Sequence, residues 1–443
     1  MKSRLLTLAA LALAPLAFAA PDAALRDAVA KKLSAEYPSL ETIYQDLHAH
    51  PELSFMETRT AALVAQELRS LGFAVTEKVG NTGVVAVFKN GPGKTVLIRE
   101  DMDALPLLEK TGVPYASTVP VKDLAGKDSP AMHACAHDSH VTSLLGTARV
   151  LTALRDRWTG TLVLIAQPAE EIGAGALAMI TDGLFTRFPV PDYVLGMHVW
   201  AGLPAGTVAY VPGPVTANVD ALDILVRGVG GHGSRPHTTK DPVVIASEIV
   251  LALQTIVSRE LEPGTPAVVT VGTFHGGTKR NIISDEVKLE LTLRSYDDNV
   301  AAHLIASIKR IAENIARAAG VPADRLPVVT AADTSTPVCA NNPVLTERLV
   351  GVWRGWLGES NVTLGKALTV GEDFARYGRT THHVPICLWL VGATAPAEIA
   401  DAARSGAVLA SNHSPLFAPV PEPTLKGAIT SLSAATLDLL APK

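Results

Sequence analysis

The 443-residue sequence has few cysteines, few aromatic residues and no excess of positive charge. Its three cysteines, Cys135, Cys339 and Cys387, are too few and odd in number for a disulfide framework. If Cys135 binds a metal, the other two can pair or stay buried, and the sequence leaves both open. Aromatic residues make up 5% and hydrophobic residues 48%, which suits a soluble α/β protein rather than a membrane protein. A net charge of -5 without a basic block excludes nucleic acid as an expected partner.

Long apolar runs without helix breakers are also scarce, and the clearest one lies at the N-terminus. Lys2 and Arg4 precede an apolar run over residues 5–16, and residues 17–19 (Ala-Phe-Ala) have the small-x-small pattern of a signal-peptidase site. We therefore expect residues 1–19 to be a cleaved signal peptide. The mature protein would be periplasmic or secreted and would not contact a membrane after cleavage.

Residues 132–140 (MHACAHDSH) form the stretch richest in metal-binding atoms. Imidazole and thiolate groups are the ligands that zinc and similar ions prefer, and a nearby carboxylate can complete the shell or orient a ligand. The alternative is a polar helix start with a buried cysteine. Spacing alone does not choose among the five donors, which are His133, Cys135, His137, Asp138 and His140.

Three predicted buried strands run directly into carboxylate or imidazole side chains. The strands over residues 95–98, 161–166 and 193–197 are followed by Asp101 and Asp103, by Glu170 and Glu171, and by His198. Each pair of carboxylates alone is explained equally well by a solvated loop, and a single histidine at a strand end is more often a structural residue. The carboxyl ends of parallel strands meet at one edge of a doubly wound sheet, so together with the Cys/His stretch they favour one shared metal centre. Two adjacent glutamates can divide the labour there, one as ligand and one as general base.

The pattern changes between residues 216 and 330, where predicted elements follow the order β-α-β-β-α-β of a ferredoxin-like fold. We therefore expect an α/β protein of two domains. The catalytic domain comprises residues 20–215 and 331–443, and the α+β domain of residues 216–330 is inserted within it. A glycine-rich loop in the insertion, residues 230–237, presents His232 on a tightly turning backbone.

Local patterns predict several further helices in the catalytic domain. Residues 22–33 and 40–50 are expected to form two helices, and residues 371–374 to start another. A capping box of Ser54 and Glu57 is expected to begin the helix that Gly72 ends.

Taken together, the motifs resemble those of the M20 metallopeptidase family, specifically its amidohydrolase branch of hippurate hydrolases, N-acyl-amino-acid amidohydrolases and auxin-conjugate hydrolases. Any one motif is weak, but nine in family order over nearly the whole mature chain are specific. They are residues 50–54 (HPELS), 101–106 (DMDALP), 132–140, 167–171 (QPAEE), 196–199 (GMHV), 231–237 (GHGSRPH), 281–287 (NIISDEV), 371–374 (GEDF) and 413–415 (HSP).

The resemblance implies a catalytic domain that binds two divalent metal ions, most simply Zn or Mn with Co or Ni as alternatives, and an inserted lid through which the chain forms a homodimer. It makes Glu170 the general base and gives Asp103 the task of orienting a ligand or the base. It places His232, often of the neighbouring subunit, at the developing oxyanion, and Asn281 and Arg294 on the substrate. The implied metal ligands are Cys135, His137, Glu171, His198 and His413. Within residues 132–140, Asp138 then becomes a partner of the ligands, and His133 and His140 become structural.

The implied function is hydrolysis of the amide bond of an N-acyl or N-aroyl amino acid, with Glu170 acting on a metal-bound water. Alternatives are a metallo-dipeptidase or carboxypeptidase of the same family and, from another class, a non-catalytic metal- or ligand-binding protein. Two positions depart from the family pattern, because Ala136 stands where glycine is usual and Glu100 where alanine is usual. If residue 136 needs a positive φ, its alanine costs about 1 kcal/mol.

Overall fold

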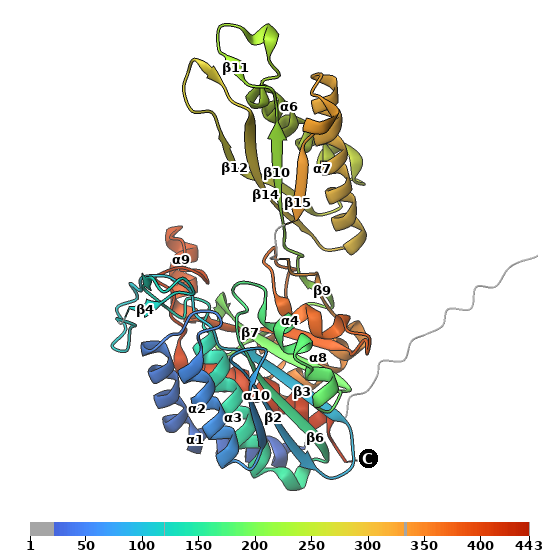
Figure 1. Ribbon diagram of the computed structural model, residues 1–443. Helices are drawn as coiled ribbons and strands as arrows, with labels where there is room; N and C mark the ends of the chain where they lie inside the picture. The colour runs from blue at the N-terminus through green and yellow to red at the C-terminus, as the bar shows by residue number, and fades with distance from the viewer. Residues whose placement is uncertain (1–21, 119, 332–334, 443) are drawn as a thin grey trace, which may run out of the picture.

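The computed structural model describes residues 22–118, 120–331 and 335–442, so the expected signal peptide at 1–19 lies outside the described residues. The chain builds one large mixed sheet with helices on both faces and a smaller sheet that stands apart from it (Figure 1). The expected α/β class with an inserted α+β unit is confirmed.

The large sheet has eight strands in the order β1-β2-β6-β3-β7-β18-β8-β17. Its central strands β6, β3, β7 and β18 are mutually parallel, so their carboxyl ends share one edge. The predicted strands 95–98, 161–166 and 193–197 are therefore neighbours. The strand bounds are β1 Ala74–Val79, β2 Gly83–Asn90, β3 Thr95–Asp101, β6 Gly160–Gln167, β7 Tyr193–Pro204, β8 Val208–Tyr210, β17 Val362–Leu364 and β18 Ile386–Thr394.

Hydrophobic side chains of this sheet alternate between two cores. On β2, Val84 and Ala86 pack into the core under the long helices, whereas Val85 packs into the core on the opposite face. Both faces are thus covered, as the nearly continuous apolar strands require. The first face is covered by α1 (Ala23–Ala49), α2 (Thr58–Ser70), α3 (His137–Ala153), α8 (Pro343–Leu357) and α10 (Pro421–Leu439), and the second by α4 (Gly175–Thr181), α5 (Leu184–Arg187) and the 3-10 helix η6 (Asp373–Arg379).

The expectation of two separate helices over 22–33 and 40–50 is wrong, because α1 is a single helix with Pro38 inside it. Buried residues recur at helical spacing on both sides of Pro38, from Val29 to Leu47. Packing of this continuous apolar stripe therefore outweighs the hydrogen bond that the proline removes.

The expected capping box at the start of α2 is also wrong. Glu57 is the N-cap residue but makes no side-chain cap bond. Its carboxylate accepts the backbone N–H of Ala169, while Ser54 Oγ donates to Asp103 Oδ2 at 2.6 Å. The side chains of Ser54 and Glu57 therefore bond to residues of the site instead of capping the helix. At residues 371–374, the expected helix start is a 3-10 helix.

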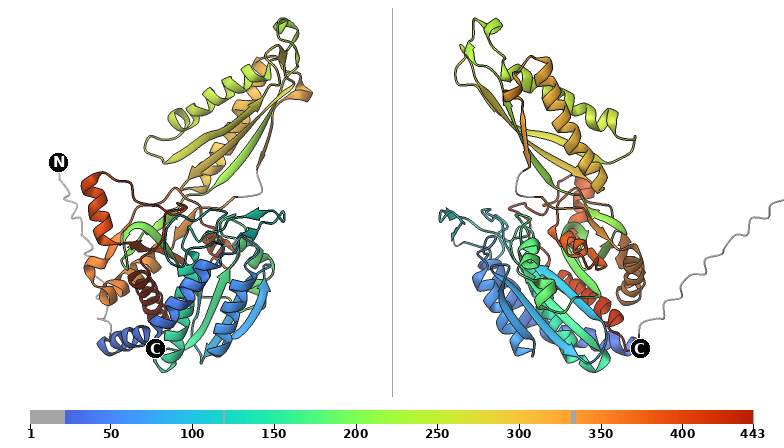
Figure 2. Two further views of the ribbon diagram at one scale, coloured as in Figure 1. Left: turned by 90° about the vertical axis from the view of Figure 1, so that its left-hand side faces the viewer. Right: turned by 45° about the vertical axis from the view of Figure 1, so that its right-hand side comes forward.

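The inserted unit is a four-stranded antiparallel sheet in the order β12-β14-β10-β15, with two helices packed against it. We call it the lid. It rises from the large sheet's carboxyl edge and points away from it in all views (Figures 1 and 2). Where the chain enters and leaves the lid, β9 (Gly213–Thr216) pairs with β16 (Cys339–Asn341). The lid comprises β10 (Asp220–Arg227), α6 (Pro242–Thr255), β12 (Ala267–Gly276), β14 (Glu286–Ser295), α7 (Asp298–Ala318) and β15 (Val328–Ala331), with β11 (Gly231–His232) and β13 (Ile282–Ile283) at its tip.

One helical stretch among the described residues, Pro242–Glu260, is long and apolar enough to cross a membrane by length and composition. Ile245, Ile249 and Leu253 on its inner side pack into the lid core. In total, 33% of this stretch is buried.

Candidate metal centre and active site

The carboxyl edge of the central strands gathers the candidate donors. Asp101 and Asp103 follow β3, Glu170 and Glu171 follow β6, and His198 lies on β7. Cys135 and His137 stand at the start of α3, directly above this edge. The expected convergence of the strand ends is therefore what the structure shows, with groups from separate parts of the chain within ligand distance of one another.

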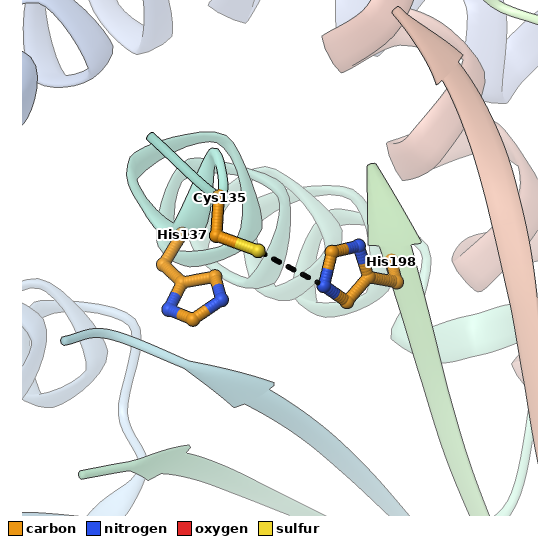
Figure 3. Close-up of side chains that lie close together, drawn as sticks. All are labelled: Cys135, His137 and His198. Atoms are coloured by element: carbon orange, nitrogen blue, oxygen red, sulfur yellow. Dashed lines mark hydrogen bonds between the residues drawn. The ribbon is translucent and has the colours of Figure 1, made fainter. Parts of the chain in front are cut away.

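Two groups of three donors overlap at one sulfur atom. Cys135, His137 and His198 form the first group, in which Cys135 Sγ lies 3.5 Å from His198 Nε2 (Figure 3). Cys135, Glu171 and His413 form the second, in which His413 Nε2 lies 3.3 Å from Cys135 Sγ and 3.4 Å from Glu171 Oε2. Because Cys135 belongs to both groups, its sulfur would be a candidate ligand in either of them.

Backbone carbonyls orient both buried imidazoles of the first group. His137 Nδ1 lies 2.8 Å from the carbonyl oxygen of Asp103, and His198 Nδ1 lies 2.8 Å from that of Val199. A carbonyl oxygen only accepts, so each Nδ1 carries the proton and donates it. Each Nε2 is then left with a free lone pair facing the cluster, as a metal ligand requires.

The donor set fits divalent metal ions. His137 Nε2 and Glu171 Oε1 are buried, lie 3.9 Å apart and have no hydrogen-bond partner among the described residues. Buried polar atoms are normally paired, so these two atoms fit the role of ligands to a bound cation. Burial and the Glu171 carboxylate raise the pKa of the Cys135 thiol well above its ordinary value. A bound cation reverses this electrostatic balance and stabilises the thiolate.

Asp103 holds both adjacent glutamates by their backbone. Its carboxylate oxygens accept the N–H groups of Glu170 and Glu171, each at 3.1 Å, in addition to the Ser54 hydroxyl. Its carbonyl orients His137 as described above. Asp103 therefore contacts the candidate base, a carboxylate donor and an imidazole donor at once.

Glu170 lies at the centre of a group of buried carboxylates. It lies close to Glu372 and Asp373, with ligand atoms of the three side chains within 4.8 Å. Burial, followed by Glu372 and Glu171, raises the pKa of Glu170 well above its ordinary value. A raised pKa makes a carboxylate a better proton acceptor near neutral pH.

Two residues that sequence reasoning did not assign to the site support this edge. Arg99 is fully buried and pairs with Asp101 at 2.9 Å, Glu372 at 3.0 Å and Asp373 at 3.1 Å, so it offsets the negative charge beneath the site. Glu57 fixes the turn before Glu170 through Ala169, whose φ is 51°. Burial and the Asp103 charge raise the pKa of Glu57 to about 7. The sequence signal for Arg99 is a charged residue inside an otherwise apolar strand. The supporting role of Glu57 was missed because its spacing from Ser54 matches a capping box.

The role expected for Asp138 is wrong. Its carboxylate points away from the donors and accepts a hydrogen bond from His48 Nδ1 at 2.6 Å. His140 instead contacts residues next to the donors. Its Nδ1 lies 2.5 Å from Asp101, and its Nε2 accepts the N–H of Val199 at 2.8 Å. His133 is buried and neither of its ring nitrogens has a hydrogen-bond partner among the described residues.

The two departures from the family pattern lie in the core of the site. Ala136 has a φ of 66°, in the left-handed region that glycine tolerates best, so its strain is real. Glu100 is buried, and its Oε1 accepts the N–H of Met197 at 3.3 Å. Both residues lie one position beyond the last residue pair between β3 and β7.

The lid residues do not join the cluster in this chain. His232 and Asn281 are exposed neighbours on β11 and beside β13, and these strands lie at the end of the lid far from the large sheet (Figure 1). Arg294 sits at the base of the lid, where its guanidinium donates to the carbonyl oxygens of Thr369 and Leu293. None of the three lines the pocket beside the metal centre.

That pocket has a volume of about 690 Å³. Cys135, Glu170, Glu171, His198 and His413 all open into it, so the candidate base and most candidate ligands reach one common space. Pockets of this size hold small molecules.

Comparison with known proteins decides the family. The model of "Peptidase family M20/M25/M40" matches residues 97–404. The chain belongs to this family of amide-bond hydrolases. It is 39% identical over 339 residues to the hippurate hydrolase of Campylobacter jejuni, with 75% of this chain and 83% of the relative covered. It is also 39% identical to thermostable carboxypeptidase 2 of Saccharolobus solfataricus, with 76% and 81% covered.

Further relatives agree with this family assignment. The N-acyl-L-amino acid amidohydrolase of Geobacillus stearothermophilus is 38% identical, with 62% of this chain and 71% of the relative covered. Among solved structures, the Bacillus subtilis protein YXEP, described as a dinuclear metal-binding peptidase of family M20, has a TM-score of 0.75 and 28% identity, with 92% of this chain and 99% of that chain covered.

Proposed function

We propose that this protein is an exported metal-dependent amidohydrolase that cleaves the amide bond of N-acyl or N-aroyl amino acids. The observation that carries the proposal is the pair of donor groups sharing Cys135, with Glu170 opening into the same pocket. The hippurate and N-acyl-amino-acid hydrolases among its relatives support the substrate class.

In this proposal Cys135, His137, Glu171, His198 and His413 hold two divalent metal ions, with Zn or Mn favoured and Co or Ni as alternatives. When bound, the ions supply Lewis acidity for the amide carbonyl and for the attacking water. Glu170 accepts the proton of the attacking water and returns it to the departing amine. Asp103 keeps Glu170 and Glu171 in register through their backbone N–H groups.

The lid completes the site in a homodimer. His232 stabilises the oxyanion that develops on the substrate carbonyl, and Asn281 contacts the substrate. Because the lid tip lies far from the large sheet of its own chain (Figure 1), and because His232 and Asn281 do not line the pocket, we propose that these residues serve the site of a second copy. Arg294 would have to exchange its contacts with the carbonyl oxygens of Thr369 and Leu293 for a substrate carboxylate.

A second candidate is a metallo-carboxypeptidase or dipeptidase, favoured by the similarity to the carboxypeptidase of Saccharolobus solfataricus. The test is a panel of N-acyl amino acids and dipeptides incubated with protein reconstituted with manganese, zinc or cobalt. Faster release of amino acid from the N-acyl compounds is expected. Faster cleavage of dipeptides would favour the second candidate, and no cleavage of any compound would favour a non-catalytic binding protein.

A further inference from the structure

We propose that Asn412 is a positioning residue of the metal centre, which holds the loop of His413 against β7 so that the His413 imidazole stays among the candidate donors. The motif of residues 413–415 does not include Asn412. The inference rests on the metal centre in the proposed function. It adds a residue that contacts the donors without being one of them.

Packing alone does not hold the His413 side chain. Its side chain is 55% exposed, whereas the side chains of the other four candidate ligands are buried. His413 also lies on a loop rather than on a helix or a strand. Ordering an exposed side chain and its loop costs conformational entropy, which other contacts must offset. The position of the imidazole therefore depends on how the backbone of the loop is held.

The backbone of His413 is itself strained. Its φ is 67°, in the left-handed region that costs a residue other than glycine about 1 kcal/mol. Such a conformation persists where the surrounding contacts determine it. One of these contacts is the N–H of His413, which donates to the carbonyl oxygen of Ala134 at 2.8 Å. The side chain of Asn412 supplies further contacts.

The Asn412 amide bonds to β7 through both of its ends. Oδ1 accepts the N–H of Ala201 at 3.0 Å, and Nδ2 donates to the carbonyl oxygen of Val199 at 3.0 Å. Both partners are backbone groups of fixed polarity, so only one orientation of the amide satisfies them. His198 on the same strand donates its Nδ1 proton to this carbonyl of Val199 as well. Asn412 thus ties the loop of His413 to the strand of His198.

The same amide nitrogen also reaches Cys135. Asn412 Nδ2 lies 3.9 Å from Cys135 Sγ, and His413 Nε2 lies 3.3 Å from the same sulfur. Two adjacent residues of one loop therefore meet this atom, one as a candidate ligand and one as a hydrogen-bond donor. A bound cation makes Cys135 a thiolate, which accepts hydrogen bonds better than a thiol does. Partners that orient metal ligands in this way typically change metal affinity by about 10- to 100-fold.

These contacts predict an unequal effect on the two donor groups. The group that contains His413 depends on the loop. The group that contains His137 and His198 does not, because both imidazoles keep their backbone carbonyl partners without Asn412. Loss of the Asn412 amide should therefore weaken the binding of one ion more than that of the other.

The test is calorimetric titration of the metal-free protein with cobalt(II). Asn412→Leu, which keeps the branching of the side chain but removes the amide, should weaken the binding of one ion on the order of 10-fold or more and leave the other near its wild-type affinity. Wild-type affinity for both ions, or equal weakening of both, overturns the proposal. Asn361→Leu is the matched control, because Asn361 is exposed, donates to the carbonyl oxygen of Leu357 at 2.8 Å and does not line the pocket.

A double-mutant cycle shows whether Asn412 acts through His413. His413→Ala is expected to weaken the same ion as Asn412→Leu. In the His413→Ala background, Asn412→Leu should add less than it does in the wild type, since the ligand that it positions is gone. Fully additive losses contradict the proposal. Thermal unfolding of the metal-free proteins checks that the variants fold, and Asn412→Ala takes the same place in the cycle if leucine prevents folding.

These measurements separate the inference from the proposed function, because none of them requires turnover. If the wild type cleaves no N-acyl amino acid or dipeptide, the proposed function fails, yet selective loss of one ion in Asn412→Leu still supports the role of Asn412. If substrates are cleaved and Asn412→Leu binds both ions as the wild type does, the proposed function stands and the inference fails.

Discussion

The catalytic domain and the lid present their candidate site residues in opposite ways. In the catalytic domain, Cys135 and His137 are fully or almost fully buried, and hydrogen bonds fix the backbone and side chains around them. In the lid, His232 and Asn281 are exposed and do not line the pocket, and their strands lie at the end of the lid far from the large sheet (Figure 1). The first region is organised by one chain alone. In the proposed function, the second region contributes only after a lid movement or from a second copy, so that proposal separates metal binding from completion of the active site.

The largest effect expected outside the catalytic domain tests the lid half of this comparison. His232→Ala should lower kcat on the order of 100-fold, because it removes one donor to the oxyanion. Metal content should not change, since His232 is remote from the donors. Turnover and elemental analysis on the same preparation check both statements.

His237→Ala is the matched control, because His237 is an exposed histidine of the same loop. Mixing His232→Ala with Glu170→Gln protein should restore activity if the lid serves a second copy. An unchanged rate for His232→Ala would remove the lid from the mechanism.

A second prediction concerns the rigidity of the catalytic domain. His48 is buried between Asp138 and Glu109, at 2.6 and 3.0 Å. Burial opposes its charge, but the two carboxylates outweigh burial and raise the pKa of His48 from 6.5 to about 10. A raised pKa stabilises the fold fully below pH 6.5, and this stabilisation is lost as the pH rises through about 10.

His48→Gln should therefore lower the free energy of unfolding by about 3 kcal/mol at neutral pH, because it leaves buried carboxylates without their cation. Its unfolding free energy should also depend less on pH between 6.5 and 10 than that of the wild type. Urea unfolding across this range measures both effects. His50→Gln is the control, since the His50 side chain is 49% exposed. Parallel pH profiles for wild type and His48→Gln would refute the ion-pair account.

The smallest effect concerns strain beside the ligands. Ala136→Gly should raise the free energy of unfolding by about 1 kcal/mol, because glycine adopts the φ of 66° without steric cost. Ala30→Gly, at an exposed interior position of α1, should instead destabilise by about 1 kcal/mol. Thermal unfolding of both variants without metal measures these two changes in stability. Destabilisation by Ala136→Gly would show that other contacts already relieve the strain at residue 136.

The sequence predicted the site best where local pattern and sheet geometry agree. Runs of buried residues ending in Asp101, Glu170 and His198 were sufficient to place these side chains at one edge, because parallel neighbouring strands allow no other arrangement. His413 carried no such signal. It reaches Cys135 from a loop near the C-terminus, and only the family resemblance pointed to it.

Other features depend on contacts that no local pattern encodes. Glu57 and Ser54 have the spacing of a capping box, yet their partners Ala169 and Asp103 come from distant strands. Asp138 lies beside His137 in sequence, but the N-terminal helix brings His48 to it and turns it away from the donors. The two helices expected over residues 22–33 and 40–50 likewise form one helix, because tertiary packing outweighs the interruption at Pro38.

The central claim is that a buried two-metal centre and Glu170 perform separate tasks. The most direct measurement is the metal content and the N-acylglycine turnover of Glu170→Gln beside the wild type, with Glu422→Gln as an exposed glutamate control. The account predicts two metal ions per chain in all three proteins and a loss of turnover of at least about 100-fold in Glu170→Gln alone. Loss of metal from Glu170→Gln, or turnover equal to that of the wild type, would contradict it.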